Sequence, residues 1–375
     1  MRRAIPPTPI IFALWLAAGI TQLATAQSVD PAKALAEIQQ KPLSKGPHGE
    51  DPASPSSVSL TPQEIEKIKE LKAKAAIVMH YSGNDWSQAQ VAGLKAQFEK
   101  MGIEVVAVTD AGFKPEKQVA DIETVLAQKP QIIVSIPTDP VSTAAAYQKA
   151  SQQGVKLVFM DNVPKGLEAG KDYVSVVSAD NYGNGVVAAH LMAKFLKGKG
   201  EIGVVYHAAD FFVTRQRYEA FKNTIQKDYP DIKIVAEQGI GGPDFSGDGD
   251  KAASAMLTSN RNLNGIWVVW DVPAEGVMSA ARSAGKDALV ITTIDLGLNV
   301  AIEIAQDGLV KGLGAQRPYD QGVTEALLAG YGLLGKPAPA YVALPALPVT
   351  RDNLLEAWKE VYHVDPPASI KDSMK

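Results

Sequence analysis

Three aspartates of the sequence each follow an apolar run directly, and a carboxylate at such a point is suited to bind hydroxyl groups. They are Asp161, Asp271 and Asp295. One carboxylate accepts hydrogen bonds from two hydroxyls at once, which suits a vicinal diol. Each aspartate could instead cap the helix that comes next. The recurrence of the pattern at three equivalent points favours ligand binding.

Two tryptophans occur at comparable points of the sequence. Trp86 follows the first apolar run, just after Asn84, and Trp270 ends a later run. An aromatic face packs well against the C–H face of a sugar ring, and burial of that contact is favourable. Both tryptophans could instead belong to the core. That is the better interpretation for Trp267 and Trp358, because these two lie within periodic elements.

Two arginines and a glutamine complete the polar candidates. Arg215 and Arg217 lie two residues apart in a helical stretch, and Gln316 follows the last apolar run. Side chains two apart on a helix face different ways, so we expect at most one arginine to reach a ligand. The other is expected in an ion pair at the surface or between domains. A guanidinium offers five fixed donors to ligand oxygens, and an amide both donates and accepts.

Other motifs indicate neither a cofactor nor a catalytic metal. The G-x-G-x-x-A match at 183–188 is separated from the preceding apolar run by residues 179–182, so it does not fit a dinucleotide-binding turn. Residues 244–250 look like a calcium loop, but the twelfth position is Ala255 rather than glutamate, which leaves only a looser cation site open. The chain has no cysteine, which excludes thiol catalysis and disulfides. We expect no cofactor and no bound metal.

The elements that must position these residues alternate along the chain. Short apolar runs, typical of strands, are separated by longer amphipathic stretches, typical of helices. This alternation predicts an α/β fold with two doubly wound parallel-sheet domains, whose ligands bind beyond the carboxyl ends of the strands. The strand candidates form two series of five: 75–81, 103–109, 131–136, 155–160 and 173–178, then 201–207, 232–238, 264–270, 288–294 and 311–315.

The N-terminal part of the chain predicts export. Residues 1–26 have a basic start, an apolar stretch at 10–20 and a small-residue cleavage site ending at Ala26, as in a signal peptide; an uncleaved anchor is the alternative. With no cysteine to carry a lipid, export without an anchor favours the periplasm. Residues 27–74 are expected to form a flexible leader and a short helix: 27–60 contain Pro, Ser, Gly and mixed charges, and the helix that follows begins near Thr61.

Taken in order, these and further short motifs resemble the type I periplasmic binding proteins of ABC transporters, particularly the ribose-binding-like sugar group. The resemblance covers about 75–345. The motifs that carry it are Pro137-Thr138-Asp139, Met160-Asp161-Asn162, Ala179-Asp180-Asn181, Arg215-x-Arg217-x-x-x-Phe221, Asp271 with Ala274 and Gly276, Ile294-Asp295, and Ala315-Gln316 with Gly322.

The resemblance implies two α/β lobes joined by three hinge crossovers, which close on a ligand. The N-terminal lobe would comprise 75–178 plus 318–345, and the C-terminal lobe 179–317 plus 346–365. It also implies the ligand-binding positions, with Phe245 as a stacking ring and Arg217 as a ligand arginine. These positions are Asn84, Trp86, Asp161, Asn162, Arg217, Phe245, Trp270, Asp271, Asp295 and Gln316.

Three departures from ribose binders make the expected site less polar. Ile136 stands where a polar residue is usual, Asn162 where arginine is frequent, and Trp270 where asparagine is usual. We therefore expect a different pentose, a deoxy sugar, a polyol or a less polar ligand rather than D-ribose.

The expected function is capture of a small hydroxylated solute by a monomer, followed by delivery to an ABC transporter permease, with no bond made or broken. The formal net charge of −4 and the absence of a basic block disfavour a nucleic-acid partner. The alternatives are an exported glycoside-hydrolase-like enzyme that uses two of the strand-end aspartates, and a ligand sensor that signals to a membrane receptor. A repressor is disfavoured, because a signal peptide stands where a DNA-binding headpiece would be.

Overall fold

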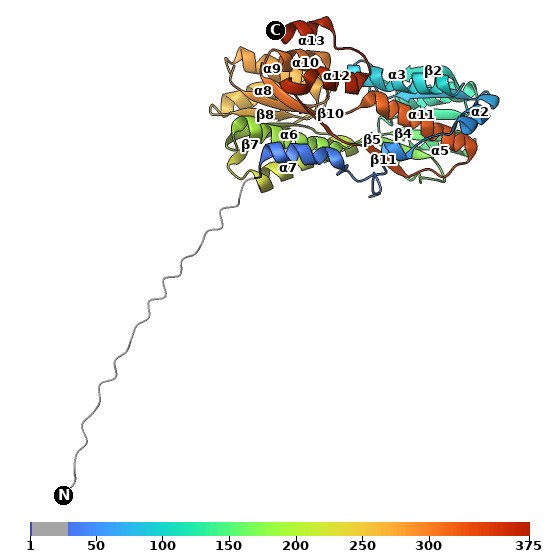
Figure 1. Cartoon of the computed structure of the whole chain (residues 1–375), viewed down its shortest axis with the longest axis horizontal. Coiled ribbons are helices and arrows are strands. Elements are labelled where there is room, and N and C mark those ends of the chain that lie inside the picture. Colours follow the sequence, from blue (N-terminus) through green and yellow to red (C-terminus); the bar gives the residue numbers. More distant parts are fainter. Residues whose placement is uncertain (2–28) are drawn as a thin grey trace.

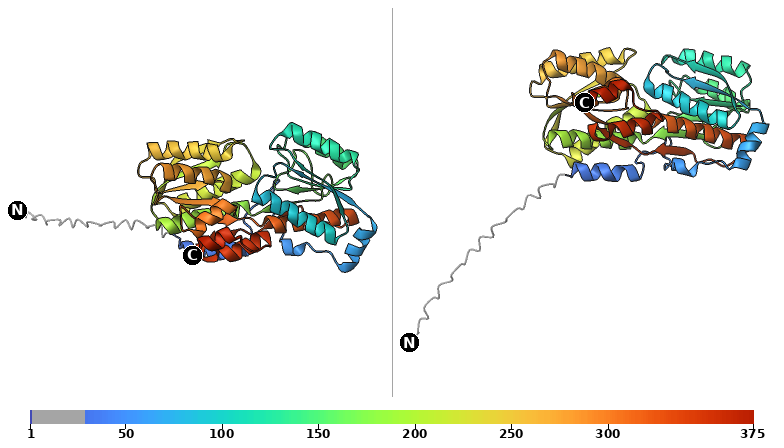
Figure 2. Two further views of the ribbon diagram at one scale, coloured as in Figure 1. Left: turned by 90° about the horizontal axis from the view of Figure 1, so that it is seen from above. Right: turned by 45° about the horizontal axis from the view of Figure 1, so that its top comes forward.

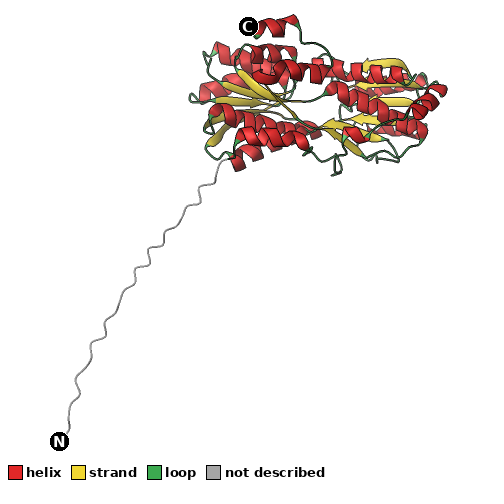
Figure 3. Cartoon of the chain, in the orientation of Figure 1, coloured by secondary structure: helices red, strands yellow, loops and turns green. Residues whose placement is uncertain are grey.

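The computed structural model describes Met1 and residues 29–375, and in it the chain forms two lobes side by side (Figure 1). Residues 2–28, which include the predicted cleavage point after Ala26, lie outside the described part. Each lobe has a six-stranded sheet, and helices cover both faces of it (Figure 3). In the described residues, no helix is both long and apolar enough to cross a membrane.

The sheet of the first lobe is parallel throughout and has the order β11-β5-β4-β3-β1-β2. All of its strands except β2 are buried apart from, at most, the first residue, which explains why they read as continuous apolar runs rather than as alternating ones. The strands are β1 (Lys74–Met79), β2 (Glu104–Asp110), β3 (Ile132–Ser135), β4 (Lys156–Met160), β5 (Ser175–Ala179) and β11 (Tyr341–Leu344).

Helices cover both faces of this sheet, and successive residues of β1 show the two sides. Ile77 and Met79 pack toward α3 and α11, whereas Ala76 and Val78 pack toward α4 and α5, as the period of two in a strand requires. The helices of this lobe are α2 (Pro62–Glu70), α3 (Asp85–Lys100), α4 (Pro115–Ala127), α5 (Ala144–Gln152) and α11 (Pro318–Leu334). The predicted cap of α2 is confirmed, because Thr61 and Glu64 form a reciprocal capping box.

The sheet of the second lobe has the order β12-β10-β9-β8-β6-β7, and only its edge strand β12 runs antiparallel. Trp267 lies fully buried in this sheet and stacks on Phe221 at a ring distance of 4.7 Å, so it is a core residue as expected. The strands are β6 (Gly200–His207), β7 (Ile232–Ile240), β8 (Gly265–Val268), β9 (Val290–Ile294), β10 (Val310–Ala315) and β12 (Leu347–Thr350).

Paired helices again flank the sheet of the second lobe, with α6 beside α7 and α8 beside α9. The C-terminal helices pack near α10, at the end of the chain (Figure 1). The elements are α6 (Asn181–Leu196), α7 (Phe212–Asp228), α8 (Phe245–Ser259), α9 (Asp271–Ser283), α10 (Leu298–Ala305), η3 (Arg351–Asn353), α12 (Leu354–Tyr362) and α13 (Ala368–Ser373).

The chain passes between the two sheets after β5, after β10 and after β11. These crossings lie together at the junction of the lobes (Figure 2). The predicted fold class, two doubly wound α/β domains joined by three crossovers, is confirmed.

Residues 29–58, which we expected to form a flexible leader, instead lie against both lobes. Their elements are α1 (Pro31–Glu37), η1 (Ile38–Gln40) and η2 (Pro55–Ser57). Leu35 and Ile38 are buried on α6 of the second lobe, whereas Ala53 pairs with Val342 at the edge of the first sheet. A Pro- and Ser-rich composition alone favours disorder. Burial of these apolar side chains offsets the conformational entropy that the segment loses when it is ordered.

Asp180, at the first crossover, ties the leader to the hinge. Its carboxylate caps α6 by accepting the Gly183 N–H, and it also accepts the N–H groups of Leu43 and Ser44 and the Ser44 hydroxyl, all at 2.8–2.9 Å. Asp180→Ala leaves these buried donors unpaired, so we expect the free energy of unfolding to fall by about 3 kcal/mol. Ser44→Ala, which removes one hydroxyl, is expected to cost about 1 kcal/mol. Urea denaturation checks both values, and equal losses in the two variants would contradict this role of Asp180.

Candidate functional site

A cavity of about 660 Å³ lies between the lobes, where the carboxyl ends of both sheets face each other. Residues that follow β1, β2, β3 and β4 line it from the first lobe, and residues that follow β6, β7, β8, β9 and β10 line it from the second. This is the position at which parallel α/β sheets bind ligands. The size is within the range of about 300–1,000 Å³ that is usual for small-molecule sites.

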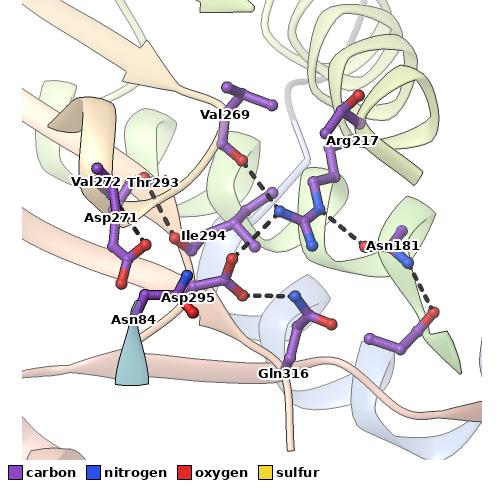
Figure 4. Close-up of polar contacts among 12 residues, drawn as sticks. Asn84, Asn181, Arg217, Val269, Asp271, Val272, Thr293, Ile294, Asp295 and Gln316 are labelled. Atoms are coloured by element: carbon purple, nitrogen blue, oxygen red, sulfur yellow. Dashed lines mark hydrogen bonds and ion pairs between the residues drawn. The ribbon is translucent and has the colours of Figure 1, made fainter. Parts of the chain in front are cut away.

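The polar side of the cavity is organised around Arg217 of α7 (Figure 4). Its Nη1 donates to Asp295 Oδ2 and to the Val269 carbonyl, at 3.3 and 3.4 Å. The other oxygen of Asp295 accepts from Gln316 Nε2 at 2.7 Å. Arg217, Asp295 and Gln316 are each at least nine-tenths buried, so this ion pair and its hydrogen bonds are shielded from competing water.

The same network continues into the first lobe through the hinge. Arg217 Nε donates to Asn181 Oδ1 at 2.8 Å, and Asn181 Nδ2 donates to Ser178 Oγ at 3.0 Å. The Ser178 hydroxyl in turn donates to Asp161 Oδ1 at 2.6 Å. We call the six side chains of this hydrogen-bond network the polar floor. They are Asp161, Ser178, Asn181, Arg217, Asp295 and Gln316.

Asp161 and Asp295 hold equivalent places in the two lobes, directly after β4 and β9. Both have left-handed backbone conformations, with φ of 55° and 71°. Such a conformation is uncommon outside glycine and is found preferentially at functional sites. Neither aspartate is the cap residue of a helix, so the capping alternative does not describe these two.

Burial sets the protonation behaviour of the groups around the cavity. It raises the pKa of Asp161 to about 6; the Ser178 hydrogen bond and the Arg217 charge act in the opposite direction, while Asp295 raises it further. Burial lowers the pKa of His207, and Arg217 lowers it too. Burial also lowers the pKa of His80 to about 4. The two imidazoles are therefore neutral rings at pH 7.

Aromatic rings form the walls of the cavity. Trp270 lies 4.9 Å from Phe245 and 5.5 Å from His207 between ring centroids, all in the second lobe. Phe113 of the first lobe meets Phe245 edge to face at 5.7 Å, so rings from the two lobes are in contact across the cleft. Trp86 contributes a further ring from the start of α3.

A sequence profile of the periplasmic binding protein domain matches residues 75–336. The chain belongs to this family. The matched region runs from β1 to the end of α11 and contains the strands β1 to β10. The leader, β11, β12 and the C-terminal helices lie outside it. The predicted resemblance is therefore confirmed.

Individual members of the family are similar over most of their length. A D-ribose/D-allose-binding protein of Pseudomonas aeruginosa is 28% identical over 57% of this chain and 68% of its own. The ribose import binding protein of Salmonella typhimurium is 24% identical over 72% of this chain and 88% of its own.

Solved structures share the fold. An arabinose-binding protein from Geobacillus stearothermophilus, 24% identical, has a TM-score of 0.66 and covers 76% of this chain and 98% of its own. A solute-binding protein from Agrobacterium vitis, solved with α-D-tagatopyranose, is 21% identical and has a TM-score of 0.71, covering 78% of this chain and 99% of its own.

Eight of the ten residues implied by resemblance to this family line the cavity together. They are Asn84, Trp86, Asp161, Arg217, Phe245, Trp270, Asp295 and Gln316. They come from both lobes, as the predicted interlobe site requires. Arg215, by contrast, pairs with Asp210 near the surface, which agrees with the expectation that only one of the two arginines reaches the site.

Asn162 and Asp271 are buried but do not line the cavity. The Asn162 N–H donates to the Met160 carbonyl and closes a turn at Asp161. This turn directs Asp161 rather than Asn162 to the cleft. Asp271 lies in the first turn of α9, where its carboxylate accepts the Val272 N–H at 2.9 Å. Burial and the nearby Asp295 raise the pKa of Asp271 well above its usual value. The position of Asp271 therefore indicates a role at the start of α9 rather than contact with a ligand.

Sequence reasoning missed a further set of rings in the lining. These are His80, Tyr81, Phe113, His207 and Phe211. His80 directly follows β1 and His207 ends β6, so the strand-end rule that selected the aspartates would also have selected them. Phe113 and Phe211 lie in loops beyond the strands and gave no such signal.

The possible cation site at 244–250 is absent in the part of the chain that the structure describes, where no group of three or more metal-ligating side chains occurs. Asp244 instead caps α8, because its carboxylate accepts the Gly247 N–H.

Proposed function

We propose that this protein captures a small polyhydroxylated solute, a sugar or a polyol, between its lobes and delivers it to the permease of an ABC importer. The observation that carries the proposal is the polar floor, which brings one strand-end carboxylate from each lobe, Asp161 and Asp295, to a single cavity. The relatives named for ribose, allose and arabinose support the ligand class. An exported periplasmic monomer fits this role.

The polar floor is already arranged for hydroxyl groups. Asn181 and Asp295 hold the Arg217 guanidinium, and Asp295 holds the Gln316 amide nitrogen. Gln316 Oε1 is buried and has no hydrogen-bond partner among the described residues, so it can accept from a ligand hydroxyl. Because these side chains are fixed by their neighbours, little further ordering is needed on binding, which favours affinity.

A glycoside hydrolase is the alternative that one observation favours. A general acid needs a carboxyl with a raised pKa, and burial raises the pKa of Asp161 to about 6. Asp295, however, is held by Arg217 and Gln316, and the relatives are named as binding proteins. We propose binding without turnover. Stoichiometric binding of glycosides without product supports this, and multiple turnovers would establish the enzyme instead.

A thermal-shift panel of sugars and polyols tests the proposed function. A ligand that binds only the folded protein stabilises it by RT ln(1 + [L]/Kd), about 4 kcal/mol at a thousandfold excess over Kd. We expect a clear rise in Tm with at least one pentose, hexose or polyol. No shift with any member of a broad panel would contradict the proposal.

Tryptophan fluorescence gives a second test, because Trp86 and Trp270 line the cavity whereas Trp267 and Trp358 do not. Trp86 is also buried in the core of the first lobe, as Trp267 and Trp358 are in the second. Binding changes the surroundings of the first two indoles only. We expect the ligand-induced emission change to be mostly lost in a Trp86→Phe/Trp270→Phe double variant and retained in Trp358→Phe. A full response in the double variant would place the ligand elsewhere.

A further inference from the structure

The cavity has a second part that the polar floor does not use. Four rings from both lobes line this part and are each at least partly exposed, and we call them the aromatic mouth: Tyr81, Phe113, Phe211 and Phe245. Tyr81 stacks on Phe113 at 5.0 Å, and Phe113 meets Phe245 at 5.7 Å. Val141, which is 63% exposed, adds an aliphatic side chain to this rim. The cleft is therefore amphipathic, with hydrogen-bonding groups at its floor and apolar groups at its mouth.

Phe113 is held in place at a conformational cost. Its φ is +59°, a conformation that is a clear outlier for a bulky residue, and the preceding Gly112 is also left-handed at +57°. The Phe113 N–H donates to the His80 carbonyl at 2.8 Å, which fixes the turn. The ring that this turn presents remains 38% exposed. Backbone strain clusters at ligand sites, and here it presents the ring to the cavity.

Charged groups also line the cavity near the mouth, namely Lys114, Asp139 and Asp210. Asp139 accepts the N–H groups of Val141 and Ser142, and Asp210 pairs with Arg215. The neighbouring His207 is neutral at pH 7, because burial and Arg217 lower its pKa.

The size of the cavity also exceeds what one sugar ring fills. A single ring displaces roughly 200 Å³, the space of six or seven waters at about 30 Å³ each. The cavity measures about 660 Å³. The rings of the mouth line part of this cavity, where apolar contact is more favourable than contact with water.

We propose that the ligand has two parts, a hydroxylated ring or chain that binds the polar floor and an aromatic group that packs within the aromatic mouth. Aryl glycosides have this construction, and we propose them as the ligand class. The inference rests on the proposed function, because it requires that the hydroxylated part binds at Asp161 and Asp295.

The test compares matched methyl and phenyl glycosides of ribose, arabinose and allose by calorimetry, beside the free sugars. We expect the phenyl member of at least one pair to bind ten times more tightly than the methyl member. In Phe113→Ala and Phe211→Ala this preference is expected to fall below threefold, whereas Val235→Ala, an exposed apolar residue of β7 outside the cavity, keeps it.

The outcomes separate the inference from the function on which it rests. Equal binding of methyl and phenyl glycosides overturns the two-part ligand but leaves solute capture standing. A preference that stays tenfold in Phe113→Ala and Phe211→Ala, with both affinities reduced, shows that the mouth acts as a latch between the lobes and overturns the inference. Failure of every sugar and glycoside to bind overturns the inference, and it overturns solute capture too when no sugar or polyol of the thermal-shift panel binds.

Discussion

Asp295→Asn is expected to weaken ligand binding at least about thirtyfold while the protein remains folded. Asp295 accepts from Arg217 Nη1 and Gln316 Nε2 and lines the cavity, so its charge orients both donors. Asparagine has nearly the same shape and tolerates the left-handed backbone found here, with φ of 71°. It offers only one oxygen, however, and its amide nitrogen opposes a neighbouring donor. Truncating one member of a buried charged pair costs about 2–5 kcal/mol in binding, which is thirtyfold or more.

Asp307→Asn is the matched control for this variant. Asp307 also has a positive φ, 52°, and pairs with a cation, Lys311, at 2.9 Å. It lies between α10 and β10, at the opposite end of the sheet from the cleft, and does not line the cavity. Calorimetry should show unchanged affinity in Asp307→Asn and a large loss in Asp295→Asn. Equal affinities in the two variants would remove Asp295 from the site.

Strand positions were largely predictable because buried parallel strands leave continuous apolar runs. All ten predicted strands occur, each shifted by at most a few residues at its ends. The two strands missed were β11 and β12, which are four residues long; Pro345 directly follows β11, and Pro348 lies within β12. Both are edge strands, where a missing N–H is tolerated. Their pairing depends on distant partners, and no local pattern records it.

The docked leader was hidden for a similar reason. Leu35, Ile38 and Val58 are isolated apolar residues in a segment whose composition predicts disorder. What holds the segment is a set of contacts distant in sequence, such as the hydrogen bond from the Ser44 N–H to Asp180, 136 residues away. A loop-like composition describes the local preference of the chain and not the surface on which it rests.

The site was predictable where a residue directly follows a strand and not where a loop reaches back to it. Asp161 and Asp295 were found because topology places the ends of parallel strands at one edge. Phe113 comes three residues beyond β2 and depends on an unusual backbone conformation that its residue type does not signal. Asp271 shows the converse, since it follows the strand-end rule but turns into the first turn of α9.

The buried carboxyl of Asp161 should make the ligand-free protein less stable as the pH rises. Burial raises its folded pKa to about 6 from an ordinary value of 3.8. Between these values the folded state holds a proton that the unfolded chain has released, so the free energy of unfolding falls with rising pH. The full cost, about 3 kcal/mol, is reached above pH 6. We therefore expect Asp161→Asn, which cannot ionise and can still accept the Ser178 hydrogen bond, to be more stable than the natural protein at pH 7.5 and about equal to it at pH 4.

Denaturant unfolding of both proteins at pH 4 and pH 7.5, without ligand, measures this difference. Burial also raises the pKa of Asp180 and Asp271, which are present in both proteins and cancel in the comparison. Glu325 does not cancel fully, because the Asp161 charge raises its pKa; Asp161→Asn removes this repulsion as well, which adds to the stabilisation expected at pH 7.5. Ser178→Ala should act in the opposite direction, because loss of its hydrogen bond makes ionised Asp161 still less favourable in the folded state. Asp161→Asn should also bind ligand much more weakly despite its greater stability, since the ionised carboxylate is the group that receives the hydroxyls. A variant that is neither stabilised at pH 7.5 nor impaired in binding would show that Asp161 is not a buried ligand carboxylate, because the same burial accounts for both effects.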